Sequence, residues 1–88
     1  MIVHKSDDGK HKYVAVFENG KKVRFGAVGY LDFTQHHSTD RRNAYILRHR
    51  NNEDWNDPYS AGALSRWILW EKPSLHEGIS FFNHKFNV

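Results

Sequence analysis

An Asn19-Gly20 dipeptide separates two apolar-rich runs near the N-terminus, His11 to Phe17 and Lys22 to Phe25. A type I′ turn requires positive φ at both central positions, and these residue types tolerate it, so the dipeptide predicts a β-hairpin. A further run, Ile2 to Lys5, is joined to the hairpin by the turn sequence Asp7-Asp8-Gly9. The first third of the chain is therefore predicted to be a three-stranded antiparallel meander.

The middle strand of this meander carries apolar side chains on both faces. Tyr13, Ala15 and Phe17 point to one side and two valines to the other, because successive residues of a strand alternate. The chain has 88 residues and no cysteine, so one small core has to stabilise it, and aromatic side chains supply most of that core. We expect a single domain over residues 1–88, with helices covering one face of the sheet.

The segment after the meander contains a predicted bend and a first helix. Gly26 and Gly29 interrupt the strand pattern and are expected to mark a place where the backbone lies close to another segment. Ser38 or Thr39 then caps a helix with an acidic residue in its first turn, which favours the helix dipole. This helix is expected to end near Asn51.

Two further helices are predicted in the C-terminal half. Asp57-Pro58 supplies a cap and a first-turn proline for a helix that continues to Lys72, apolar around most of its circumference and therefore central. Ser74 and Glu77 have the spacing of a capping box, which begins the last helix. Its apolar residues recur at helical intervals: Leu75, Ile79, Phe82 and Phe86. The expected fold class is α+β, a small N-terminal antiparallel three-stranded meander packed against two or three helices.

Residues 40–55, DRRNAYILRHRNNEDW, combine four arginines with acids and aromatics. On a helix beginning near residue 39, Arg48 shares a face with Tyr45, and His49 shares the adjoining face with Glu53. We expect Arg48 and His49 to pair with Glu53, Asp54 or Asp32 and to stack on aromatic rings, so that these groups chiefly stabilise the fold.

Phosphate binding is the second interpretation of these cations. The chain has thirteen Lys and Arg against ten Asp and Glu, a net charge of +3, which permits an acidic partner without requiring one. Cations in two parts of the sequence are predicted to form one basic strip for nucleic acid or another partner: Lys21, Lys22, Arg24, Arg41, Arg42 and Arg50.

A catalytic interpretation is the weakest of the three. His36-His37, Asn43 and His49 follow the order of the His-Asn-His metal nucleases, but they are spaced within one cap and one helix, without the loop that would fold them around a metal ion. No carboxylate pair or phosphate loop is evident. We expect no catalytic residues, no metal site and no cofactor, and a nuclease of this type stays a remote alternative.

A resemblance covers residues 25–75. The stretches FGAVGYLDFTQHH, DRRNAYILRH, EDW and AGALSRWILWEKPSL resemble a family of small uncharacterised proteins of nucleocytoplasmic large DNA viruses, from algal viruses and mimivirus relatives. One departure is Ser38, where that family's pattern has an acid, although either residue type caps a helix. Polar members of the pattern lie among aromatics and suggest a structural hydrogen-bond network: Asp32, His36, Arg48, His49, Glu53, Trp55 and Ser65.

The resemblance implies a viral protein without assigning an activity. We expect a non-enzymatic, virion-associated structural or interaction component of the minor capsid or cement type, which binds larger viral structural proteins through exposed aromatics and cations. A small basic protein that binds DNA or RNA is the alternative. No apolar run approaches the ~18 residues of a membrane span, and the N-terminus lacks a signal-peptide pattern. The expected location is therefore the virion or the infected host cell, without secretion.

Overall fold

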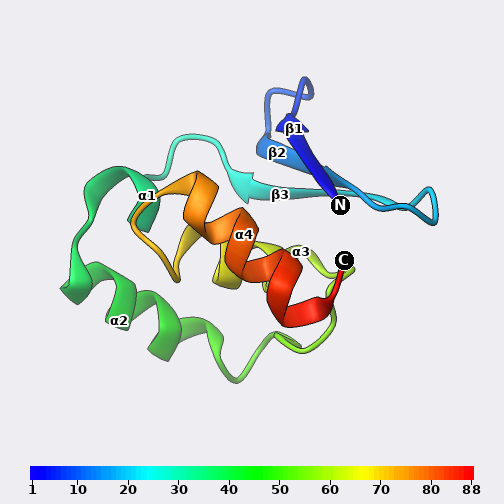
Figure 1. Ribbon diagram of the computed structural model, residues 1–88. Coiled ribbons are helices and arrows are strands. Elements are labelled where there is room, and N and C mark those ends of the chain that lie inside the picture. Colours follow the sequence, from blue (N-terminus) through cyan, green and yellow to red (C-terminus); the bar gives the residue numbers. More distant parts are fainter.

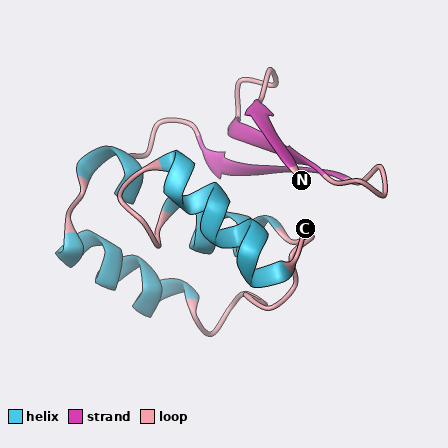
Figure 2. Ribbon diagram, in the orientation of Figure 1, coloured by secondary structure: helices cyan, strands magenta, loops and turns pink.

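A computed structural model describes all residues, 1–88, as a three-stranded sheet followed by helices (Figures 1 and 2). The elements in chain order are β1 (Ile2–Lys5), β2 (His11–Val16), β3 (Lys22–Ala27), α1 (Phe33–His36), α2 (Thr39–His49), α3 (Ala61–Leu64), the π-helix η1 (Ser65–Leu69) and α4 (Leu75–Phe86). This order confirms the α+β class, although there are four helices where two or three were predicted, since α1 was not foreseen. No helix has the length and apolar character that crossing a membrane requires.

The sheet is the predicted antiparallel meander in the order β1-β2-β3. The hairpin between β2 and β3 is confirmed. Its turn is not the predicted type I′, because that turn needs positive φ at both Asn19 and Gly20, and only Gly20 has it. In the register, Tyr13 lies opposite Phe25, while Arg24 lies opposite Val14 on the other face of the sheet. The helices lie on one side of the sheet (Figure 1).

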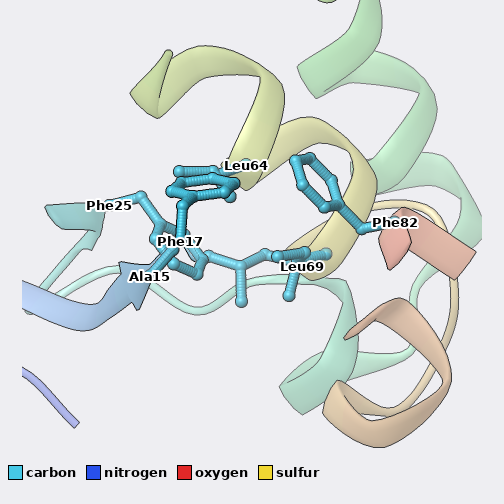
Figure 3. Close-up of a cluster of buried hydrophobic side chains, with 7 residues drawn as sticks. Ala15, Phe17, Phe25, Leu64, Leu69 and Phe82 are labelled. Carbon is cyan, nitrogen blue, oxygen red and sulfur yellow. The ribbon is translucent and has the colours of Figure 1, made fainter. Parts of the chain in front are cut away.

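The core is formed where α3, η1 and α4 pack beneath the sheet (Figure 3). Its buried residues are Ala15, Phe17, Phe25, Leu64, Ile68, Leu69 and Phe82. Two glycines permit close contacts: a Cβ at Gly26 would lie 2.9 Å from Leu69 Cδ1, and one at Gly78 would meet the η1 backbone. The close approach predicted at Gly26 is thus confirmed, whereas a Cβ at Gly29 would have no neighbour within 4 Å and that glycine serves a turn with φ of +96°.

Serine side chains cap the three main helical segments. Ser38 accepts from the Arg41 N–H at the start of α2, and Ser74 caps α4 as predicted. The central helix begins later than predicted, because Ser60 caps it and accepts from the Ala63 N–H. Asp57 instead closes the preceding turn by accepting from the Tyr59 N–H. The segment is nevertheless the most buried one, and the apolar stripe of α4 packs on the core as predicted.

Candidate functional site

A cleft of about 650 Å³ lies between the end of β3, the two helices α1 and α2, and the α3–η1 segment. This volume is in the range of small-molecule and nucleotide sites. Six of the seven residues predicted to form a structural polar network line it: Asp32, His36, Arg48, His49, Glu53 and Ser65. These six residues border one concave surface, but of the predicted hydrogen-bond network only the link from Trp55 through Glu53 to His49 is present.

Trp55, the seventh member, lies outside the cleft and fixes Glu53. Its Nε1 donates to Glu53 Oε2 at 2.9 Å, while Glu53 Oε1 lies 3.2 Å from His49 Nδ1. The predicted pairing of His49 with Glu53 is therefore confirmed. A carboxylate at Nδ1 orients the imidazole and leaves Nε2 without a partner in the chain, an arrangement suited to proton transfer or to contacting a ligand.

Stacked rings form the wall of the cleft behind this pair. Tyr45 stacks on His49 with ring centroids 4.4 Å apart, and on Trp70 at 4.3 Å with an interplanar angle of 3°. Burial, followed by the charge of Glu53, raises the pKa of Tyr45, so its hydroxyl stays protonated. The Tyr45 and Trp70 rings therefore give this wall a flat, uncharged aromatic surface.

Arg48 was predicted to be paired within the fold and Arg42 to be free for a partner, and the structure shows the reverse. The guanidinium of Arg48 makes no hydrogen bond or ion pair within the chain and borders the cleft, so its expected pairing with Glu53, Asp54 or Asp32 is wrong. Arg42 was assigned to the free basic strip, but its Nε donates to the Trp70 carbonyl at 2.9 Å and its Nη2 to Glu71 Oε1 at 2.7 Å. Arg42 therefore fixes α2 to the segment after η1.

The predicted basic strip does not exist as one surface. The β2–β3 turn and α2 lie at opposite sides of the molecule (Figure 1). Lys21 lies over the Tyr59 ring, and Arg24 is within 3.9 Å of Asp7 and 3.7 Å of Asp8. Lys22 and Arg50 are exposed but do not line the cleft. Of the six strip residues, only Arg41 borders the cleft.

Asp32 and His36 shape the other end of the cleft. Asp32 is 3% exposed, caps α1 and accepts from Lys12 Nζ at 2.7 Å, so its charge is compensated. His36 Nδ1 accepts from the Ser38 N–H at 2.9 Å, which places the ring proton on Nε2, a buried atom without a partner. Burial and then the charge of Arg41 lower the pKa of His36, and both effects favour the neutral ring.

The sequence interpretation missed Lys12 and Arg66. Lys12 borders the cleft from β2, and no sequence pattern linked it to Asp32. Arg66 is 7% exposed, lies over the Trp67 ring at 4.2 Å and donates to Glu71 Oε1 at 2.9 Å. The nearby acid and tryptophans were the available signal for this buried arginine.

No group of three or more His, Asp or Glu side chains is placed to hold a metal ion. Of the residues named for the nuclease alternative, His36 and His49 line the cleft and Asn43 does not. The two histidines are spaced by the ring stack of Trp70 and Tyr45. The arrangement of these residues therefore gives the nuclease alternative no ligand set.

Exposed apolar side chains lie on the loop between β3 and α1. Val28 is 52% exposed, Tyr30 75% and Leu31 57%, whereas all three tryptophans are half-buried. Tyr30 and Leu31 also line the cleft. A docking surface marked by an exposed aromatic would thus lie at Tyr30, beside the cleft, and not at a tryptophan.

A family model described only as a family of unknown function matches residues 1–49, more than half of the chain. The match includes Asp32, His36, Arg41 and Arg48 and ends before Glu53. No curated protein and no solved structure matches the chain.

Proposed function

Because the chain belongs to the family of unknown function DUF5754, we propose a function from the cleft itself: the protein binds single-stranded nucleic acid and holds one nucleotide there. The observation that carries the proposal is the pair Arg41 and Arg48. They are seven residues apart on α2, both border the cleft, and neither guanidinium has a partner within the chain. Two such groups on one wall suit the oxygens of a phosphate.

The acids of the cleft form no ion pair with these two arginines. Asp32 accepts from Lys12 Nζ, and Glu53 accepts from Trp55 Nε1 and pairs with His49. Neither carboxylate binds a guanidinium group, so Arg41 and Arg48 are available to a ligand, while the negative charge of Glu53 stays near His49 at one end of the cleft. A phosphate entering the cleft would gain charge-assisted hydrogen bonds without displacing an internal ion pair.

The aromatic side chain beside the cleft favours a nucleotide over a bare anion. Tyr30 is 75% exposed at the cleft, and an exposed aromatic ring is a stacking platform for a base of any sequence. The cleft volume of about 650 Å³ accommodates a nucleotide. The proposal therefore keeps the nucleic-acid alternative of the sequence interpretation and moves it from a surface strip to the cleft.

Alanine variants of Arg41 and Arg48 test this site. Each is expected to weaken binding of a fluorescein-labelled twelve-residue oligo(dT) or oligo(U) by about tenfold, and to lower the salt slope of log K by roughly 0.7. The measurement is fluorescence anisotropy at several salt concentrations. The melting temperature of Arg48→Ala is expected to equal that of the wild type, since its guanidinium makes no hydrogen bond or ion pair within the chain.

Arg50→Ala is the matched control. Arg50 is an exposed arginine at the end of α2 that makes no ion pair and does not line the cleft, so its loss should change affinity by less than about twofold. Equal losses for Arg50→Ala and Arg48→Ala would reject the cleft as the binding site. Tighter binding of an acidic peptide than of the oligonucleotide, at the same salt concentration, would reject nucleic acid as the ligand.

A virion-associated interaction protein is the second candidate, supported by the exposed loop of Val28, Tyr30 and Leu31 and by the resemblance to proteins of large DNA viruses. In this case the partner is a larger viral structural protein, and the location is the virion or the infected cell. The protein is then expected to copurify with intact particles at a fixed stoichiometry after nuclease treatment, measured by quantitative mass spectrometry. Its loss together with the free nucleic acid would contradict this candidate.

A further inference from the structure

A second hollow, of about 550 Å³, adjoins the cleft. The two concave surfaces share Lys12, Tyr30 and Leu31, so the exposed Tyr30–Leu31 segment is a ridge between them. Resting on the function proposed above, we propose that a single strand crosses this ridge. One nucleotide occupies the cleft, its neighbour occupies the hollow, and the Tyr30 ring stacks against a base at the crossing.

The exposure of the ridge supports a crossing strand. Tyr30 is 75% exposed and Leu31 57%, and together with Val28 at 52% they group exposed apolar side chains on one loop, as at a ligand or partner site. The cleft and the hollow are each large enough for a nucleotide. A ligand confined to the cleft would use one side of the ridge, whereas a strand uses both.

The cations on the two sides of the ridge provide separate phosphate positions. Arg41 and Arg48 serve the cleft. In the hollow, Lys5 makes no ion pair, whereas His11 Nδ1 is bound to Asp8 Oδ2 at 2.6 Å. Lys12, which both sides share, is already held by Asp32 at 2.7 Å. Lys5 is therefore the group that a phosphate in the hollow would contact.

Asp8 neighbours the lining residue Gly9 in sequence, and its carboxylate is bound by His11. The hydrogen bond from His11, followed by that from the His11 backbone, lowers the pKa of Asp8, so it stays ionised and bound to that ring. Asp8 also does not line the hollow. The lining of the hollow contains no acidic side chain, and Lys5 is the lysine of this lining that no carboxylate of the chain holds.

A length series tests the crossing. Thymidine 5′-phosphate, the dinucleotide pTpT and hexameric oligo(dT) are compared as competitors of the labelled twelve-residue strand. The wild type is expected to bind pTpT about tenfold more tightly than the mononucleotide because of the added stacking and phosphate contact. Lys5→Ala is expected to weaken pTpT binding by roughly fivefold and to leave the mononucleotide affinity unchanged.

Lys10→Ala is the control for charge. Lys10 is an exposed lysine in the turn between β1 and β2, and it does not line the hollow. Tyr30→Phe keeps the ring and is expected to bind pTpT as the wild type does, whereas Tyr30→Ala is expected to lose about tenfold. Equal affinity for mononucleotide and pTpT, or equal losses for Lys5→Ala and Lys10→Ala, would overturn the crossing. The cleft site would stand if Arg48→Ala still weakened mononucleotide binding, and both proposals would fall if no nucleotide bound.

Discussion

Gly78→Ala is expected to lower the free energy of unfolding by about 3 kcal/mol or more. The added Cβ would lie 2.0 Å from the Ile68 carbonyl oxygen and 2.8 Å from its carbon. These are backbone atoms of η1, so no side chain can rotate away, and α4 would have to move off the core. The gain in helix propensity, about 1 kcal/mol, offsets only part of this cost. Urea denaturation followed by circular dichroism measures the change.

Two alanine variants separate the clash from the general effect of alanine in a helix. Ser80→Ala lies on the exposed side of α4 and should be within about 0.5 kcal/mol of the wild type. At Gly62 the Cβ would meet the Glu53 side chain, with Cδ at 3.0 Å. Glu53 can shift, so Gly62→Ala should retain stability while loosening Glu53 from His49. A Gly78→Ala protein as stable as Ser80→Ala would contradict the packing described here.

The contact at Gly78 also affects the candidate site. Ile68 belongs to η1, and the same π-helix supplies Ser65 and Leu69 to the lining of the cleft. Its other side presses Leu69 against Gly26 of β3. The close contacts with Gly26 on one side and Gly78 on the other thus fix the position of η1, which lines the cleft. π-Helical segments are rare and are frequently found at functional sites, which agrees with the location of this one.

Local patterns were sufficient to predict most of the fold. The hairpin, the Ser38 and Ser74 caps and the stripe of α4 each depend on residues only a few positions apart. The short helix α1 could have been predicted from the same kind of pattern, because Asp32 and Gln35 form a capping box. The start of α3 was predicted wrongly, because Asp57 and Ser60 are both plausible caps and lie close together in the sequence. Ser60 is the cap, and the Asp57 side chain accepts a hydrogen bond in the preceding turn.

The candidate site was predictable in its members but not in their roles. Six of the seven residues predicted as a polar network border one cleft, but only Trp55, Glu53 and His49 are linked by hydrogen bonds. Whether Arg42 or Arg48 had a partner depended on the rotation of α2 against the segment after η1, which brings Glu71 to Arg42. The separation of Lys22 and Arg24 from α2 likewise depends on how the sheet is placed on the helices. No short-range pattern contains either relation.

Glu71→Gln is the second substitution expected to have a large effect, with a loss of about 3 kcal/mol. Glu71 Oε1 accepts from Arg42 Nη2 at 2.7 Å and from Arg66 Nη1 at 2.9 Å. Arg66 is 7% exposed, and its Nε is buried without a partner. Burial lowers the pKa of Arg66, but an arginine stays protonated, so the neutral amide would leave an uncompensated buried charge.

Arg42→Gln and Arg66→Met identify the source of that loss. The Arg42 side chain is 22% exposed, so removing it should cost about 1 kcal/mol. In an Arg66→Met, Glu71→Gln double variant the buried charge is absent, and the stability is expected to return to within about 1 kcal/mol of the wild type. The measurement is chemical denaturation of the three single variants, Glu71→Gln, Arg42→Gln and Arg66→Met, and of the double variant. A Glu71→Gln protein no less stable than Arg42→Gln would show that Arg66 finds sufficient compensation in the faces of Trp55 and Trp67, and that these rings, not the carboxylate, hold the charge.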